Sequence, residues 1–131
     1  MAELKIGDVA KQTGMTVKSI RYYHDIGLVC AKRNDVGYRV YQQSDVATLS
    51  FIHHCRDLGF SIEDCKTLTS LKHNQSRSAE EVKQLATAHL LQIESRIKNL
   101  TTLKQQLEAM IHDCQGGSQP DCAILSRLSE I

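Results

Sequence analysis

Two cysteines near the end of the sequence are spaced so that one metal ion could bind both. Cys114 closes a long helical pattern, Gly116 and Gly117 let the chain reverse, and Cys122 stands where a short helix is expected to begin. Thiolates on opposite sides of an ion lie about 4–5 Å apart when each metal–sulfur bond is ~2.3 Å. A helix N-terminus at Cys122 also favours the thiolate that a metal needs. The loop therefore predicts a metal site at Cys114 and Cys122.

The donor set indicates which metals this loop suits. Thiolates select soft ions such as Cu(I), Zn(II) and heavier metals. Two sulfurs alone suit a two-coordinate monovalent ion, Cu(I), Ag(I) or Au(I), whereas Zn(II) normally takes four ligands. His112 is a candidate third ligand, although a histidine at a helix end is more often a surface residue that interacts with the helix dipole. A reversible disulfide between Cys114 and Cys122, which would make the chain a thiol redox sensor, stays open as an alternative.

The remaining cysteines and the bulk composition limit the class of protein. The chain holds five cysteines, an odd number, and begins without an apolar leader, so we expect reduced thiols and a cytoplasmic protein. Cys55 and Cys65 fall on apolar faces and are expected in a core. No apolar run approaches the roughly 18 residues of a membrane span. No nucleotide-binding loop, paired carboxylates or Ser/His/Asp order stands out, so an enzyme is not expected.

A long helix must position the cysteine loop. Residues 79–113 contain no Gly or Pro, and apolar residues recur there at intervals of three and four. The apolar positions run from Val82 through Leu85, Leu90, Ile93, Ile97, Leu100, Leu103 and Leu107 to Met110 and Ile111. A domain this small cannot bury so long a stripe. The pattern therefore predicts a dimerisation helix that pairs with a second copy of the chain.

The first part of the chain predicts a helix-turn-helix. A helical face ends at Thr13-Gly14, and Thr16 is placed to cap a second helix over 17–25. On that helix the periodicity turns Lys18, Arg21 and Tyr22 outward, where they could meet DNA, and turns Tyr23 inward. An ordinary helical hairpin would give the same pattern.

A hairpin and two further helices are expected next. Residues 29–41 combine turn residues with Tyr38, Val40 and Tyr41, which favour strands, so they predict a wing that carries Arg33 and Arg39. Ser44-Asp45 is expected to cap a helix to Asp57, and Ser61 another to Leu71. The predicted fold is mostly α, with a winged helix-turn-helix (1–71), a hinge (72–78), a dimerisation helix (79–113) and a metal-binding loop with a short helix (114–131).

Charge is distributed unevenly although the net charge is only +1. Residues 1–43 hold seven Lys or Arg against four Asp or Glu, whereas the remainder holds nine against eleven. A basic first third fits a nucleic-acid surface confined to that part of the chain. A solvated basic face would give the same asymmetry.

Several of these stretches together resemble the MerR family of metal-responsive transcription regulators. They are "IGDVAKQTGMTVKSIRYYHDIGLV", the wing "GYRVY", "DLGFSIEDC", the long helix and the cysteine-bearing end. The resemblance implies a homodimer joined as an antiparallel coiled coil, which binds promoter double-stranded DNA. It also implies that the dimer acts on RNA polymerase indirectly, by bending and untwisting the promoter when the effector binds. The DNA contacts that it implies are Lys18, Arg21, Tyr23, Arg33, Tyr38 and Arg39.

The cysteine loop most resembles the CueR, copper(I)-responsive branch of that family. The resemblance therefore implies Cu(I) as the effector, with Ag(I) and Au(I) as surrogates, and activation of metal-efflux and detoxification promoters. Divalent sensors for Zn, Cd, Pb or Hg resemble one another in an additional cysteine at the start of the long helix, where this chain has Ala79. Copper-type members usually carry a serine there, and a proline where this chain has Ala123. The absence of that cysteine argues against a divalent sensor, which stays open as the other alternative.

Overall fold

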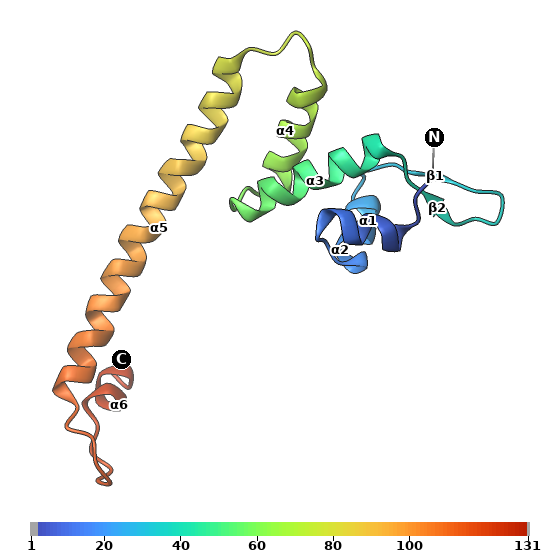
Figure 1. Ribbon diagram of the computed structural model, residues 1–131. Helices are drawn as coiled ribbons and strands as arrows, with labels where there is room; N and C mark the ends of the chain where they lie inside the picture. Colours follow the sequence, from blue (N-terminus) through green and yellow to red (C-terminus); the bar gives the residue numbers. More distant parts are fainter. Residues whose placement is uncertain (1–2, 131) are drawn as a thin grey trace. The chain divides into compact units, whose positions relative to one another are not determined.

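The computed structural model describes residues 3–130, which form a mostly helical fold, as predicted (Figure 1). The elements in chain order are α1 (Ile6–Thr13), α2 (Val17–Asp25), β1 (Lys32–Arg33), β2 (Arg39–Val40), α3 (Gln43–Asp57), α4 (Ile62–His73), α5 (Ala79–Asp113) and α6 (Ala123–Leu128). The chain divides into two compact units, Met1–Leu85 and Ala86–Ile131, so α5 belongs to both. Each unit is described by itself.

The predicted helix-turn-helix is present. Gly14 ends α1 with φ +74°, a left-handed backbone conformation that residues other than glycine rarely adopt. The Thr16 side chain then accepts a hydrogen bond from the backbone N–H of Ser19 at 3.1 Å, which caps α2 as expected. Ile20 and Tyr23 are buried on the inner face of α2. The outer face of the same helix is thereby left exposed.

The wing is a short antiparallel hairpin shaped by one asparagine. Lys32 pairs with Val40 and Arg33 with Arg39. The side-chain oxygen of Asn34 accepts hydrogen bonds from the backbone N–H groups of Val36 at 3.1 Å and Tyr38 at 2.9 Å. These bonds hold the turn of the hairpin in one conformation.

The next helices follow the prediction except at their ends. α3 begins at Gln43 with Gln42 as its N-cap, so the expected cap at Ser44-Asp45 was wrong. Asp45 instead lies one turn inside the helix, where its carboxylate accepts from the backbone N–H of Gln42 at 2.9 Å. Ser61 caps α4 as expected, accepting from the N–H of Asp64 at 3.1 Å. α4 continues to His73, which shortens the connection to α5 to 74–78.

Two apolar cores hold the first unit together. The larger core joins α1, α2, the wing and α3 through Val9, Met15, Ile20, Tyr23, Val29, Tyr41, Val46, Leu49 and Ile52. The smaller core holds Cys55, Phe60, Cys65 and Leu68. Val82 and Leu85 from α5 pack against this smaller core. The unit therefore extends into α5 instead of ending at the connection.

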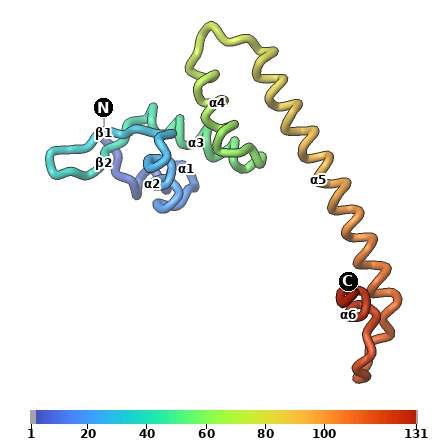
Figure 2. Tube along the Cα trace, turned by 180° about the vertical axis from the view of Figure 1, so that it is seen from behind, coloured from blue at the N-terminus to red at the C-terminus, as the bar shows by residue number. Residues whose placement is uncertain are grey.

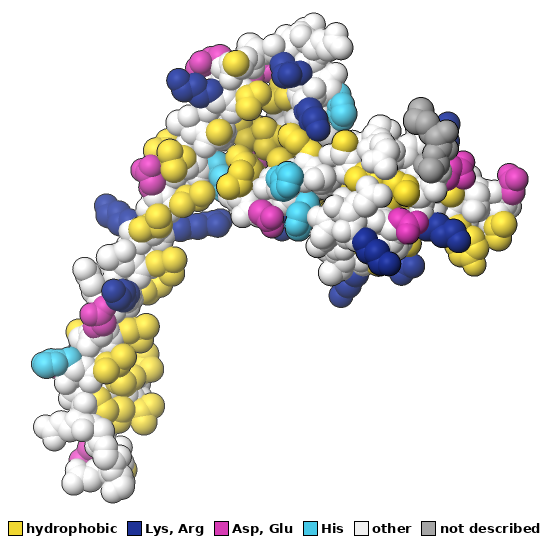
Figure 3. All heavy atoms as spheres, in the orientation of Figure 1, with side chains coloured by type: hydrophobic (Ala, Val, Ile, Leu, Met, Phe, Trp, Pro, Cys, Tyr) yellow, Lys and Arg dark blue, Asp and Glu magenta, His cyan; other side chains and the backbone are white. Residues whose placement is uncertain are grey.

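In the second unit, α5 carries a stripe of exposed apolar side chains, seen as hydrophobic surface along the helix in Figure 3. The stripe comprises Leu90, Leu91, Ile97, Leu100, Leu103, Leu107 and Ile111, each more than half exposed. α6 lies beside the last turns of α5, as both views show (Figures 1 and 2). No helix among residues 3–130 is long and apolar enough to cross a membrane.

Candidate metal centre and nucleic-acid interface

The loop after α5 brings the two predicted metal ligands together. The Sγ atoms of Cys114 and Cys122 lie 3.5 Å apart, and both residues are half-buried. The backbone N–H of Cys114 bonds the carbonyls of Met110 and Ile111, each at 3.2 Å, which continues the last turn of α5. Cys122 is the N-cap of α6. The last turn of α5 and the start of α6 thus fix the two ends of the loop.

The reversal between the cysteines depends on two glycines. Gly116 and Gly117 have φ angles of +73° and +84°, in the left-handed region that favours glycine. No atom outside the local chain lies within 4 Å of a Cβ built at either position. Backbone conformation, and not crowding, therefore explains why glycine is needed here.

The environment of Cys122 favours its thiolate. The backbone N–H of Leu125, first of all, and then the Cys114 thiol and the N–H of Ile124 lower the pKa of Cys122. Hydrogen bonds to a charged group stabilise that charge. Because metals bind the thiolate and not the thiol, this arrangement prepares Cys122 for a soft metal ion.

Two positions that bear on the choice of metal, His112 and the start of α5, can be compared with the structure. Within residues 3–130, no group of three or more His, Cys, Asp or Glu side chains is gathered as a metal would need, so His112 does not join the two cysteines. At the start of α5, the Ser78 side chain accepts a hydrogen bond from the backbone N–H of Glu81 at 3.2 Å. Ser78 therefore caps the helix, and Ala79 is its first residue.

The other cysteines have different environments. Cys55 and Cys65 are buried in the smaller core, as predicted. Burial raises the pKa of both thiols, that of Cys65 to about 11. Such thiols stay protonated and unreactive near neutral pH. Cys30 is exposed.

The predicted DNA-contacting cations lie on an exposed face of the first unit. Lys18, Arg21 and Arg33 are exposed, and Arg39 is half-buried. Arg21, Arg33 and Arg39 line one groove of about 750 Å³, formed by α2, the wing and the segment before α1. The groove is therefore basic at the place where the sequence predicted a nucleic-acid surface.

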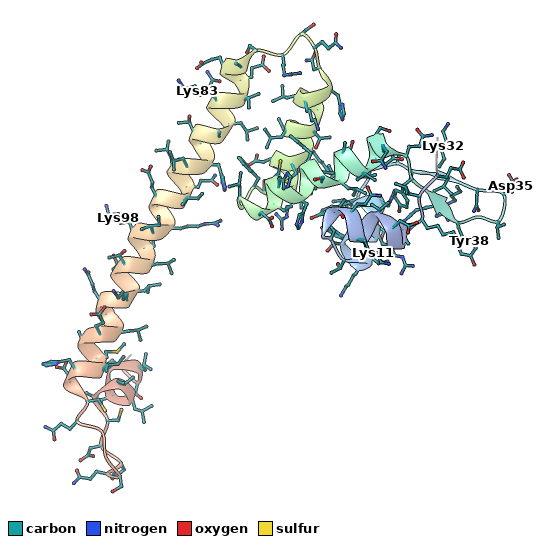
Figure 4. All side chains as sticks on the ribbon, viewed as in Figure 1. Lys11, Lys32, Asp35, Tyr38, Lys83 and Lys98 are labelled. Atoms are coloured by element: carbon teal, nitrogen blue, oxygen red, sulfur yellow. The ribbon has the colours of Figure 1, made fainter. Side chains whose placement is uncertain are left out.

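Two wing residues differ in how free their side chains are. Tyr38 is 71% exposed and projects from the hairpin on the side away from Lys32 (Figure 4). Arg33 donates from Nη1 to the carbonyl of Gly37 at 2.7 Å, so part of its guanidinium group already stabilises the wing. The remaining N–H groups of Arg33 are those left for a phosphate.

The two tyrosines of α2 face opposite ways. Tyr22 is 50% exposed, whereas Tyr23 is 8% exposed and belongs to the larger core. The helical periodicity placed them correctly. Little of the Tyr23 surface is left for the DNA contact that the resemblance implied, and Tyr22 presents far more.

Lys5 is a groove residue that the sequence pattern did not predict. Lys5 lines the groove because Leu4 forms a β-bridge with Tyr41, which lays the start of the chain along the base of the wing. The two backbone N–H···O bonds of this bridge are both 2.8 Å. A pairing between residues so far apart in sequence leaves no local signal.

Comparison with known proteins identifies the class of protein that this fold defines. The chain matches the family model "MerR HTH family regulatory protein" over residues 4–72, and the model "MerR, DNA binding" over residues 46–110. It belongs to the MerR family of helix-turn-helix transcription regulators. The expectations of that family and of a protein that is not an enzyme are thus confirmed.

Individual relatives match along almost the whole chain. The transcriptional regulator HmrR of Rhizobium leguminosarum bv. viciae is 40% identical, over 97% of this chain and 98% of its own length. The regulator CueR of Salmonella typhi is 37% identical, over 96% of this chain and 92% of its own. Among solved structures, PbrR691 from Ralstonia metallidurans CH34 in complex with lead(II) has a TM-score of 0.83 at 25% identity, covering 96% and 99% of the two chains.

Proposed function

We propose that this chain is a metal-responsive regulator that senses Cu(I) through Cys114 and Cys122, with Ag(I) and Au(I) as surrogate ions. The observation that carries the proposal is the 3.5 Å separation of the two sulfurs on a glycine loop. A linear two-coordinate ion needs them about 4–5 Å apart, from two bonds of ~2.3 Å. The loop therefore has to open by only about 1 Å. The backbone freedom of Gly116 and Gly117 allows this movement.

Charge balance favours a monovalent ion. Two thiolates around a monovalent cation carry a net charge of −1, and the N–H groups of Ile124 and Leu125 beside Cys122 stabilise negative charge there. A divalent ion such as Zn(II) would take further ligands to complete its shell. The similarity to CueR supports the same reading, since the loop resembles that copper(I)-responsive branch.

The basic groove is proposed to bind promoter DNA. The contacting residues would be Arg21, Arg33, Tyr38 and Arg39, which line the groove, together with Lys18 on the exposed face of α2. Tyr23, which the resemblance also implied, lies in the larger core instead. Arginines in a shared groove can neutralise neighbouring phosphates, and the exposed Tyr38 hydroxyl can donate to a phosphate oxygen. The match to the MerR HTH family model over residues 4–72, which include all of these residues, supports the assignment.

The apolar stripe of α5 is proposed to form the homodimer. A contiguous row of exposed leucines and isoleucines on one helix is costly in water, and a second copy of the same helix can cover it. We propose that the two helices pair in antiparallel orientation. A dimer would also present two DNA-binding units to one palindromic site.

The regulatory step is proposed to be distortion of the promoter, which then admits RNA polymerase at metal-efflux and detoxification genes. Smooth bending of a DNA site of roughly 20–30 base pairs costs on the order of 1–6 kcal/mol. A metal can offset this cost only if it binds the distorting state of the dimer more tightly than the relaxed state. A metal–thiolate site is strong enough to supply such a difference.

Two alternatives have specific support. A divalent sensor is supported by the likeness to the lead(II)-bound structure. A thiol redox sensor is supported by the sulfur separation of 3.5 Å, which is only about 1.5 Å longer than a disulfide bond.

Run-off transcription tests these readings. Reduced protein on a promoter that it binds is titrated separately with Cu(I), Ag(I), Zn(II), Pb(II), Hg(II) and peroxide. Activation by Cu(I) and Ag(I) alone is the expected result. Activation by Zn(II), Pb(II) or Hg(II) alone would favour a larger coordination shell, and activation by peroxide in metal-free buffer would favour the redox sensor.

A further inference from the structure

A part-buried hydrogen bond joins the helix and the wing that carry the proposed DNA contacts. Tyr41, directly after β2, has no exposed surface, and its Oη lies 2.8 Å from Nε2 of His24 in the last turn of α2. The two rings also meet edge to face, with centroids 5.4 Å apart. A buried hydroxyl without a partner is costly, so the bond holds the two elements at one separation.

The second nitrogen of His24 fixes the direction of this bond. The backbone of Val29 raises the pKa of His24, as a carbonyl that accepts from the ring does. With Nε2 facing Tyr41, the donor is Nδ1–H, and in the neutral ring Nε2 accepts from the Tyr41 hydroxyl. His24 therefore links three segments: α2, the segment after it, and the base of the wing.

Tyr41 is also where the wing is anchored. Its backbone exchanges two hydrogen bonds of 2.8 Å with Leu4, and the two residues before it, Arg39 and Val40, form β2. A shift of Tyr41 would move β2 and with it Arg39, which lines the basic groove together with Arg21 of α2. The spacing of these two arginines depends on the position of Tyr41.

We propose that His24 and Tyr41 form a positioning pair, which holds the wing at the distance from α2 that DNA binding requires. The proposal rests on the DNA interface proposed above. Neither side chain needs to touch DNA. The pair acts through Arg39 and Arg21, by fixing how far apart they stand before DNA arrives, which lowers the ordering cost of binding.

Protonation of His24 should weaken the pair. A protonated ring makes Nε2 a donor, so the bond persists only with its direction reversed, the Tyr41 hydroxyl oxygen accepting from Nε2–H. The buried hydroxyl proton is then left without an acceptor, and the ring carries a positive charge near that of Arg39, so the reversed bond is weaker. Burial and the positive charge of Arg39 lower the pKa of His24, whereas the Val29 hydrogen bond, Asp45 and Asp25 raise it. Burial raises the pKa of Tyr41, and the charges of Arg39, Asp45 and Arg21 also act on it. The pair is therefore neutral at pH values above the ordinary histidine pKa of about 6.5. It is lost as the pH falls through the lowered pKa of His24.

The test compares DNA affinity, its salt dependence and its pH dependence in three variants. Tyr41→Phe removes only the hydroxyl. His24→Gln keeps an acceptor near the position of Nε2 that does not titrate, and Thr69→Val removes a hydroxyl that bonds the Cys65 carbonyl at 2.7 Å, in α4. Affinity is measured by fluorescence anisotropy on a duplex that the wild-type protein has selected from a random-sequence pool. Thermal melting reports folding in parallel.

Tyr41→Phe is expected to bind about tenfold more weakly at pH 7.5, as for the loss of one hydrogen bond. The slope of log affinity against log salt concentration should also become shallower by about 1, because the proposed phosphate contact of Arg39 is lost. His24→Gln should bind within about twofold of wild type and lose the fall in affinity at acid pH. Thr69→Val should change melting only.

Three results would overturn the proposal. Tyr41→Phe could keep wild-type affinity and salt slope, or it could lower both melting and affinity with an unchanged slope, as a purely structural role would do. Acid sensitivity that persists in His24→Gln would remove His24 from the pair. Arg21→Ala separates this proposal from the interface it rests on: normal affinity in that variant would refute the interface itself.

Discussion

Replacing Cys122 with serine should abolish the metal response and leave the fold and DNA binding intact. Serine has nearly the same shape and is a favoured N-cap, so α6 keeps its start. The hard hydroxyl, however, does not replace a thiolate for a soft ion. Cys114 alone would then hold the metal through one bond.

The size of the loss follows from the geometry of the loop. The loop keeps the second sulfur 3.5 Å from the first, so binding of the second thiolate is intramolecular. Linking two donors in this way raises affinity by about 10²–10⁴-fold. At 1.4 kcal/mol for each factor of ten, the loss is roughly 3–6 kcal/mol. The lost binding free energy is as large as the free energy needed to bend a promoter, about 1–6 kcal/mol. Induced transcription should therefore fall to the basal level.

Three assays check this prediction. Competition with a Cu(I)-specific chelator measures metal affinity, gel shift measures DNA binding, and run-off transcription measures activation. Cys30→Ser is the matched control, because Cys30 is exposed and lies in the first unit, outside the loop. Activation of Cys122→Ser at the wild-type Cu(I) concentration would refute the metal assignment. Loss of DNA binding in Cys122→Ser would instead show that the loop is structural.

Two further predictions concern the other surfaces. Arg21→Ala should weaken DNA binding with or without metal, by about tenfold at moderate salt for one lost charged contact, measured by anisotropy; an unchanged affinity would exclude the α2 face. Leu100→Glu, in the exposed stripe of α5, should raise the dimer dissociation constant by about a hundredfold or more in analytical ultracentrifugation, since each buried leucine contributes about 1.5–3 kcal/mol and the dimer buries two. Asn99→Glu, at an exposed polar position of the same turn, should leave the dimer intact.

Features encoded in consecutive residues were predictable from the sequence. The bounds of α5 follow from a run without Gly or Pro and from apolar residues at helical intervals. The cap at Thr16 and the cysteine-bearing loop with its two glycines likewise depend on neighbouring side chains. Periodicity also placed Tyr22 outward and Tyr23 inward, where the family resemblance had suggested Tyr23 as the contact.

Features that depend on distant pairing were not predictable in this way. The bond between His24 and Tyr41 spans 17 positions, and nothing in either local pattern indicates it. The same holds for Lys5, which reaches the groove only through the bridge of Leu4 with Tyr41. The start of α3 was misplaced for a different reason. An aspartate is favoured both at the N-cap and in the first turn of a helix. Here the Asp45 carboxylate accepts from the backbone N–H of Gln42, which places Asp45 in the first turn.

The arrangement of the two sites limits how a metal signal can reach the DNA within one chain. The cysteine loop belongs to the unit that begins at Ala86, and the basic groove belongs to the unit that ends at Leu85. The helix α5 is the covalent connection between them, and its first turns are packed into the smaller core through Val82 and Leu85. Coupling is reciprocal, so a metal that favours the distorted promoter by about 5–150-fold must itself bind that complex more tightly by the same factor. Cu(I) affinity measured with and without bound promoter therefore gives the coupling directly, and equal affinities would mean that the metal does not drive the distortion.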